Sequence, residues 1–329
     1  MSKFYLYTET AYHHQGDMDF MKGLIDSSEQ SGAQGIKFQV MTKTSDFVST
    51  KHTAYSALDS YCLNLNDWKE LFSYTQKKGL DIIMMPLNIE AFELLKQFKV
   101  KYLDIHSVSF YDDTLLEAVK LSKQDIILGV GGRTLDEIED KRKYFEDSLK
   151  ILMVGFQAFP SKIEDVKIGK ISHLINQFPD LQIGYADHSS YDDEFAIKSN
   201  EYARILGATV FEKHITTHEG VDRVDFSAAI SSIKINEIIN KLNFIDEFII
   251  TDHQTSFEFT EREIIYRDRQ LRCVAKTNLK AGTLLSKEMI CLKLIDDQED
   301  AFNNIHNLSG KILMVDLEFD SVLKTQNVN

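Results

Sequence analysis

The sequence predicts a (β/α)₈ barrel followed by a small, mostly β domain. Short apolar segments of strand length alternate eight times with longer amphipathic segments, as in repeated strand–helix units. No glycine-rich dinucleotide fingerprint follows the first apolar segment, which disfavours the alternative of a doubly wound open sheet. The length of 329 residues suits a barrel of about 250 residues with an appendage of about 60.

Eight segments are expected to form the parallel strands, which require helical crossovers between them. The predicted strands are Phe4–Thr8, Gly35–Gln39, Asp81–Met85, Tyr102–Ile105, Ile126–Gly129, Lys150–Val154, Gln182–Tyr185 and Thr209–Lys213. The predicted helices are Asp19–Ser31, Leu65–Lys78, Ile89–Phe98, Thr114–Leu121, Thr134–Ser148, Glu164–Gln177, Asp192–Leu206 and Ile230–Phe248.

The character of the sequence changes after the last predicted helix. We expect residues 1–250 to form the barrel, 251–265 a polar linker, and 266–329 a second domain. The strands predicted in this second domain are Arg272–Ala275, Thr283–Leu285, Ile290–Leu294 and Lys311–Val315. A domain this small is marginal alone and is expected to dock on a barrel.

Composition excludes several classes of partner. The formal net charge of −14 argues against nucleic acid and anionic membranes. Cys62, Cys273 and Cys291 are widely spaced, which predicts reduced thiols in a cytoplasmic protein. Neither a signal peptide nor a membrane-spanning segment is expected.

Polar residues gather where the predicted strands end, which is where barrel enzymes place their active sites. Histidine occurs at four of these eight positions. The residues are Glu9, His13, His14, Lys37, Gln39, His106, Ser107, Arg133, Gln157, Asp187, His188, Glu212, Lys213 and His214.

His188 and His214 follow neighbouring predicted strands and are expected to point at one spot. Two imidazoles there would hold a divalent ion and leave open positions for substrate oxygen and water. Three roles stay open for His13 and His106. Either could complete the metal sphere and shift its preference toward Zn²⁺, Co²⁺ or Fe²⁺, act as a general base, or fill space.

The basic residues at this end also admit two interpretations. Lys37 should point into the barrel mouth, where burial requires an anion, either a carboxylate side chain or a substrate phosphate. Lys213 is either a substrate ligand or an ion-paired or solvated lysine. Gly131-Gly132-Arg133 is either a plain turn or a phosphate-binding turn.

Five segments resemble the sialic acid synthase family, in the same order and over nearly the whole chain. Thr8–Gly16 resembles "AEIGINHNG", Gly32–Gln39 "GADAVKFQ", Ile183–Ser189 "IGYSDHT", Phe211–Thr216 "IEKHFT", and Arg272–Leu285 the antifreeze-like (SAF) domain pattern "RSLVAAKDIKKGEVL".

The resemblance implies an enzyme that condenses phosphoenolpyruvate with an open-chain N-acylated hexosamine to give a nine-carbon 2-keto acid and phosphate. It implies a divalent metal on His188 and His214, Mn²⁺ first and Mg²⁺, Zn²⁺ or Co²⁺ as alternatives, which polarises the sugar aldehyde. The catalytic residues that it implies are Glu9, His14 and Lys37. The implied substrate-binding residues are Gln39, Ser107, Arg133, Gln157, Asp187, Lys213 and Asp222. It also implies a domain-swapped homodimer in which one subunit's SAF domain covers the other's barrel mouth.

The chain departs from the family at positions that contact phosphoenolpyruvate or sugar. Asp104 stands where the family has a phosphate-binding lysine, and Ser109 where it has a sugar-binding glutamate. The other departures are Met85 for threonine, the Gly129–Arg133 loop for "STGMS", Gln157 for asparagine, Ala186 for serine, and Lys293–Asp297 for an arginine-containing SAF loop.

Three functions therefore stay open. The first is a nonulosonic acid synthase with altered sugar specificity, in which Arg133 replaces the missing lysine. The second is a metal-dependent aldolase, lyase or isomerase on a sugar acid that no longer uses phosphoenolpyruvate, which Asp104 favours because a carboxylate repels a trianion. The third is a non-catalytic paralogue acting as an interaction subunit, which the retained Glu9, Asp187, His188 and His214 disfavour.

Overall fold

The computed structural model describes residues 4–155, 158, 160–248, 258–296 and 299–329. The chain divides into two compact units, Met1–Thr251 and Asp252–Asn329. Gln157, predicted as a substrate-binding residue, lies outside the described residues.

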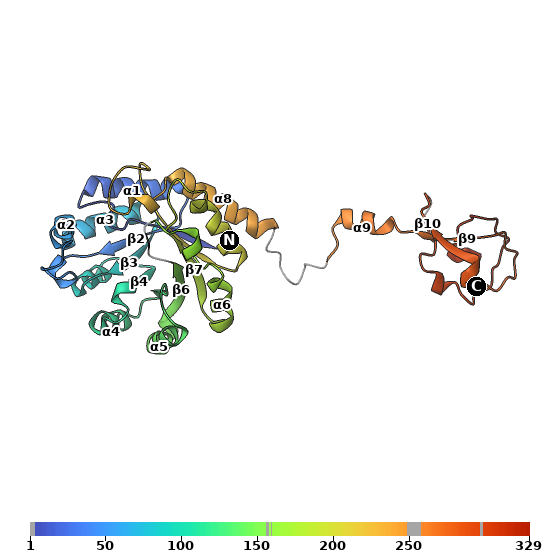
Figure 1. Ribbon diagram of the computed structural model, residues 1–329, viewed down its shortest axis with the longest axis horizontal. Coiled ribbons are helices and arrows are strands. Elements are labelled where there is room, and N and C mark those ends of the chain that lie inside the picture. Colours follow the sequence, from blue (N-terminus) through green and yellow to red (C-terminus); the bar gives the residue numbers. More distant parts are fainter. Residues whose placement is uncertain (1–3, 156–157, 159, 249–257, 297–298) are drawn as a thin grey trace. The chain divides into compact units, whose positions relative to one another are not determined.

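The first unit is a closed barrel of eight parallel strands in sequential order, and β8 pairs with β1 to close it (Figure 1). The strands are β1 (Tyr5–Glu9), β2 (Gly35–Val40), β3 (Asp81–Pro86), β4 (Tyr102–Ile105), β5 (Ile126–Gly129), β6 (Leu149–Gly155), β7 (Gln182–Asp187) and β8 (Val210–His214). Each overlaps a predicted strand, so the predicted barrel is confirmed.

Helices surround the barrel. They are α1 (Met18–Ser31), α2 (Tyr55–Tyr61), α3 (Leu65–Lys77), α4 (Asp113–Ser122), α5 (Leu135–Phe145), α6 (Lys170–Gln177), α7 (Phe195–Ile205) and α8 (Ser232–Phe248). Three details differ from prediction. Helix α2 was not expected, Ile89–Lys96 is a 3-10 helix, and α6 begins at Lys170 because a 3-10 turn and Gly169 precede it.

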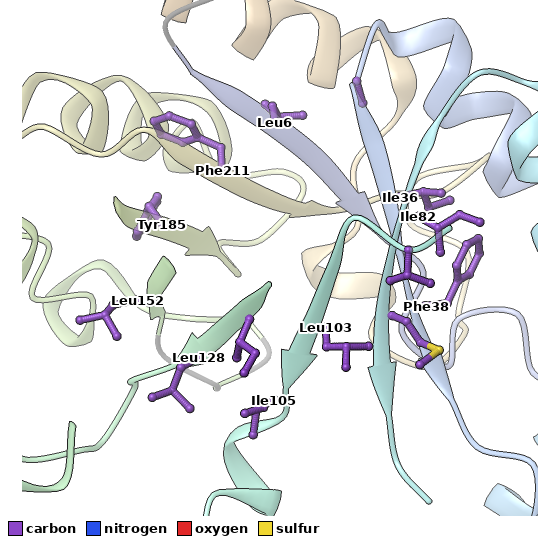
Figure 2. Close-up of a cluster of buried hydrophobic side chains, with 14 of the residues drawn as sticks. Leu6, Ile36, Phe38, Ile82, Leu103, Ile105, Leu128, Leu152, Tyr185 and Phe211 are labelled. Carbon is purple, nitrogen blue, oxygen red and sulfur yellow. The ribbon is translucent and has the colours of Figure 1, made fainter. Parts of the chain in front are cut away.

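Alternation along the strands builds two cores. Residues such as Leu6, Phe38 and Phe211 face outward and pack against the helices (Figure 2). Their neighbours Tyr7 and Val210 face inward and fill the barrel. Because successive side chains point to opposite faces of a strand, this register also decides which polar residues reach the mouth of the barrel.

The second unit has a small core around Cys273, Ile290 and Leu313. Its strands β9 (Arg272–Ala275) and β10 (Ile290–Lys293) pair antiparallel. The other two predicted strands form only isolated bridges, such as Leu284 with Ile312.

A helix, α9 (Glu261–Asp268), begins inside the segment predicted as linker. It starts there because Thr260 and Glu263 form a reciprocal capping box. No helix in the described part of the chain is long and apolar enough to cross a membrane. The three cysteines are free thiols.

Candidate metal centre and active site

A cavity of about 310 Å³ opens at the C-terminal ends of the strands, and all eight strands contribute to its lining. Six of the residues predicted as catalytic, substrate-binding or metal-binding line it: Glu9, Lys37, Gln39, Ser107, His188 and His214. The barrel register thus brings together side chains that lie more than 200 positions apart in the sequence.

Four of the lining residues form a group that could hold a metal ion. Glu9, His188, Glu212 and His214 are buried, and one potential ligand atom from each lies within 4.8 Å of the others. Nε2 of His214 is 3.2 Å from Oε2 of Glu9. The ring centroids of His188 and His214 are 5.0 Å apart. Two imidazoles and two carboxylates fit a divalent transition metal, so the donor set agrees with the predicted histidine pair and adds both glutamates.

The ionisation of these ligands suits metal binding. Burial, assisted by His214, lowers the pKa of His188 to about 3, which leaves the ring neutral at neutral pH. Burial raises the pKa of Glu9, but the attraction of Lys37 and His214 outweighs burial and holds that pKa well below its usual range. A neutral imidazole and an ionised carboxylate are the forms that bind metals.

Lys37 lies beneath this group and contacts three carboxylates. Its Nζ is 2.6 Å from Glu212 Oε2, 2.9 Å from Asp104 Oδ2 and 3.1 Å from Glu9 Oε2. Burial alone would lower the pKa of Lys37, but Asp104, Glu212 and Glu9 raise it well above its usual range. The anion that the buried lysine requires is therefore supplied by the protein, and a permanently charged amine is not a Schiff-base nucleophile.

Glu212 was not predicted as a metal ligand, although it is itself a matching residue of the family motif over Phe211–Thr216. Its Oε2 accepts hydrogen bonds from the Tyr7 hydroxyl and from Lys37 Nζ, both at 2.6 Å. Burial raises the pKa of Glu212 well above its usual range; Lys37 opposes this and Glu9 adds to it. Glu212 is thus the ligand of this group best suited to hold a proton that metal binding would release.

Two further residues that line the cavity, His106 and Asp225, have side chains that can exchange hydrogen bonds or protons with a ligand. His106 Nδ1 accepts a hydrogen bond from the Val108 N–H at 3.1 Å, which places the proton of the neutral ring on Nε2. Asp225 was missed by the sequence prediction, and burial raises its pKa. Asp222, predicted instead, is exposed and does not line the cavity.

Comparison with known proteins identifies the family. The NeuB family model matches residues 24–253. The chain belongs to the NeuB family. It is 25% identical over 344 residues to the N-acetylneuraminate-9-phosphate synthase of Mus musculus, covering 98% of this chain and 92% of that protein. It is 24% identical over 313 residues to the N,N'-diacetyllegionaminic acid synthase of Campylobacter jejuni, covering 89% and 91%.

A solved structure shows the same fold over both units of this NeuB family chain. The spore coat polysaccharide biosynthesis protein E from Chromobacterium violaceum superposes with a TM-score of 0.83 at 17% identity, covering 98% of this chain and 99% of that one.

Two predicted residues of this NeuB family chain lie away from the cavity because they sit in the turn after β1. His13 engages Val224 O through Nδ1 and Thr216 Oγ1 through Nε2, both at 2.8 Å. Both ring nitrogens are engaged by the protein, which favours the space-filling role among the three that were left open for His13. His14, predicted as catalytic, is buried against the Trp68 ring and does not line the cavity.

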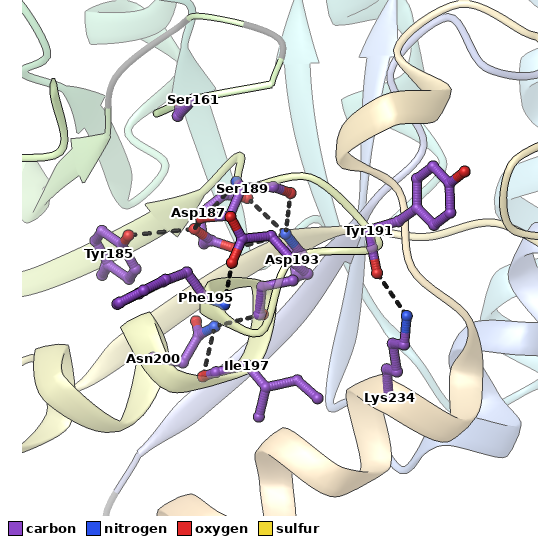
Figure 3. Close-up of polar contacts among 12 residues, drawn as sticks. Ser161, Tyr185, Asp187, Ser189, Tyr191, Asp193, Phe195, Ile197, Asn200 and Lys234 are labelled. Carbon is purple, nitrogen blue, oxygen red and sulfur yellow. Dashed lines mark hydrogen bonds and ion pairs between the residues drawn. The ribbon is translucent and has the colours of Figure 1, made fainter. Parts of the chain in front are cut away.

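Asp187 and Lys213, predicted as substrate-binding residues, lie behind the barrel wall. Both side chains point outward because their strand neighbours His188 and Glu212 point inward. Lys213 Nζ is 2.5 Å from Asp187 Oδ2, and both side chains are almost fully buried. Figure 3 shows Asp187 also receiving hydrogen bonds from Tyr185 and Ser189. The pair joins the ends of β7 and β8, where the two candidate metal ligands His188 and His214 lie.

Arg133, expected to replace a phosphate-binding lysine, does not line the cavity that contains Glu9, His188, Glu212 and His214, which is called the metal cavity below. Its side chain stacks over Phe110, with the guanidinium carbon 4.2 Å from the ring centroid, and its Nη2 donates to Ser107 O at 2.7 Å. It lines a second cavity instead.

Proposed function

We propose that this NeuB family chain is a metal-dependent synthase that joins a three-carbon enol donor, phosphoenolpyruvate, to the aldehyde carbon of an open-chain hexosamine, while water adds at C2 of the donor and phosphate leaves. The observation that carries this proposal is the buried group of Glu9, His188, Glu212 and His214 in the cavity at the mouth of the barrel. The synthase names of the relatives over most of the chain support it.

The four ligands would hold one divalent ion, for which Mn²⁺ is our first candidate and Mg²⁺, Zn²⁺ or Co²⁺ are alternatives. When bound, such an ion supplies Lewis-acid polarisation of an aldehyde oxygen. The neutral His188 and the ionised Glu9 are already in the protonation states that binding requires. Gln39 orients Glu9 by donating from Nε2 to Oε1 at 2.8 Å.

Other lining residues would serve the substrates directly. Bond formation at the aldehyde carbon requires its oxygen to take up a proton, and Asp225 is a carboxyl of the cavity lining, outside the ligand group, whose pKa burial raises. His106 presents Nε2–H as a hydrogen-bond donor for a substrate oxygen. Lys37 keeps Glu9, Glu212 and Asp104 together and forms no bond with substrate.

The ion pair between Lys37 and Asp104 favours a second candidate. Among the described residues that line the cavity, Lys37 is the only lysine or arginine, and Asp104 neutralises it. Met85, Gly129 and Ala186 bring no side-chain donor to the same cavity. A trianionic donor would meet carboxylates here. The second candidate is therefore a metal-dependent aldolase, lyase or isomerase that acts on a sugar acid without phosphoenolpyruvate.

One experiment separates the two candidates. The Mn²⁺-loaded protein is incubated with phosphoenolpyruvate and a panel of hexosamines, and released phosphate and the mass of any keto acid are measured. The synthase proposal predicts phosphate and a nine-carbon keto acid in equal amounts. The second candidate predicts no phosphate in this incubation, and release of pyruvate from, or rearrangement of, a nonulosonic acid that is supplied in a parallel incubation. In both cases the His188→Ala/His214→Ala variant should be inactive, and wild-type protein without either product contradicts both proposals.

A further inference from the structure

A second cavity, of about 180 Å³, lies on the outer side of the barrel wall between the turn after β5 and the segment that leads into α6. Its apolar floor is formed by buried side chains of the outer core: Val130, Ile138, Val154, Leu174 and Tyr185. Only Gly131 and Gly155, among the described residues, line both cavities. The backbones of these two glycines are in close contact, since a Cβ on Gly131 would lie 2.2 Å from Gly155 O. The second cavity is therefore a separate site.

The rim of this cavity is cationic. Arg133, Lys167 and Lys170 line it, against the single carboxylate of Asp165. Neither Lys167 nor Lys170 forms an ion pair with any described residue, whereas many surface lysines of this chain do. In a chain of net charge −14, Arg133 together with two lysines that have no ion-pair partner among the described residues, around an apolar floor, is a local reversal of charge.

Arg133 connects the second cavity to the first. Its side chain is 20% exposed, and its ion pair with Glu137 is long, at 3.7 Å. Its buried Nε has no hydrogen-bond partner among the described residues, so the guanidinium keeps donor capacity. Its Nη2 holds the carbonyl of Ser107, which lines the metal cavity. A ligand that attracts Arg133 would therefore act on the turn that borders the active site.

We propose that this second cavity binds a small organic anion, a phosphate monoester or a carboxylate with an apolar face. The apolar floor accounts for the hydrophobic part of the ligand and the cationic rim for its charge. The volume limits the ligand to about the size of a substituted benzene ring. This site goes beyond the proposed function and does not depend on it.

Isothermal titration calorimetry on the full chain, freed of metal by chelation, tests the proposal. Phenyl phosphate and benzoate are the probes, and benzyl alcohol is the uncharged control. At least one anion should bind at one site per chain, the tighter anion identifies the preferred head group, and benzyl alcohol should not bind measurably. Lys167→Glu/Lys170→Glu should weaken anion binding by at least about tenfold, which is 1.4 kcal/mol. The control Lys51→Glu/Lys99→Glu changes the net charge equally at exposed lysines elsewhere and should keep the affinity within about twofold.

Three results would overturn the site. Wild-type protein that binds neither anion contradicts it, as does equal loss of affinity in the two lysine variants, which would show a general effect of charge. Loss of anion binding in His188→Ala/His214→Ala would place the probes in the metal cavity. Because the titration involves no turnover and no metal, its failure is distinct from failure of the proposed function.

Discussion

The pairing of Lys37 with three carboxylates decides how the polar centre of the barrel is held together. Removing a buried charge leaves its partners uncompensated, which costs more than an exposed pair contributes. The sequence predicted that Lys37 is buried and needs an anion, but left open whether a side chain or a substrate supplies it. The strand register shows that side chains supply the anion, because Asp104 and Glu212 face inward and contact the Lys37 amine.

Lys37→Met should therefore lower the free energy of unfolding by about 3–5 kcal/mol, since it leaves Glu9, Asp104 and Glu212 buried without their cation. Urea unfolding at neutral pH measures the change. Lys51→Met, at an exposed lysine, is the matched control and should stay within about 0.5 kcal/mol. Equal stability of the two variants would contradict this account of Lys37.

His14 should make the protein acid-sensitive without serving catalysis. Burial lowers its pKa from 6.5 to about 4. Below pH 6.5 His14 is protonated in the unfolded chain, whereas in the folded chain it stays neutral down to about pH 4. The free energy of unfolding therefore falls as the pH is lowered through this window, by up to about 3 kcal/mol. His14→Asn removes the titration and can still accept the hydrogen bond that Gly16 N–H gives to Nδ1 at 3.0 Å. The variant should lose less stability than wild type between pH 7 and 4.5 in urea unfolding; identical losses would refute the assignment.

At the scale of the strand, alternation explains both what the sequence predicted well and what it missed. All eight strands were recognisable as short apolar segments, and His188 and His214 were recognisable by their position after them. Asp187 and Lys213 were grouped with these histidines because they adjoin them, although alternation turns adjacent side chains to opposite faces. Asp225 was missed because it lies beyond β8, where no strand period indicates which side chains face the cavity.

The outward Asp187–Lys213 pair should be structural. Asp187→Asn or Lys213→Met alone leaves a buried charge unpaired and should cost about 3–5 kcal/mol, and the double variant should cost clearly less than the sum. Because neither side chain lines the metal cavity, the folded double variant should still bind stoichiometric Mn²⁺. Additive losses of stability, or loss of metal from the folded double variant, would contradict this placement.

For the whole molecule, the length and the change of sequence character from about Tyr266 predict a large unit and a small one, and the structure divides after Thr251. The capping box that starts α9 inside the expected linker was recognisable only in detail, as Thr260 followed by Glu263. The second unit exposes several large apolar side chains, among them Leu284, Met314 and Phe319. Exposed apolar groups of this kind are typical of surfaces that a partner covers.

We therefore keep the homodimer as a proposal. Light scattering at micromolar concentration should give twice the chain mass of 37.8 kDa. Leu284→Glu/Phe319→Glu should shift the mass toward that of one chain if the second unit contributes to the interface. Phe244→Glu, at an exposed apolar position on α8 of the barrel, is the control and should leave the mass unchanged. A wild-type protein that runs as a monomer across the concentration series would contradict the proposal.

Glu9, His188, Glu212 and His214 form, as we propose, one divalent metal centre. The most direct measurement is the Mn²⁺ stoichiometry of purified protein, by equilibrium dialysis with elemental analysis, for wild type and for His188→Ala/His214→Ala. We predict one ion per wild-type chain and none above background in a variant that circular dichroism shows to be folded. A folded variant that still binds one Mn²⁺ per chain would contradict the claim.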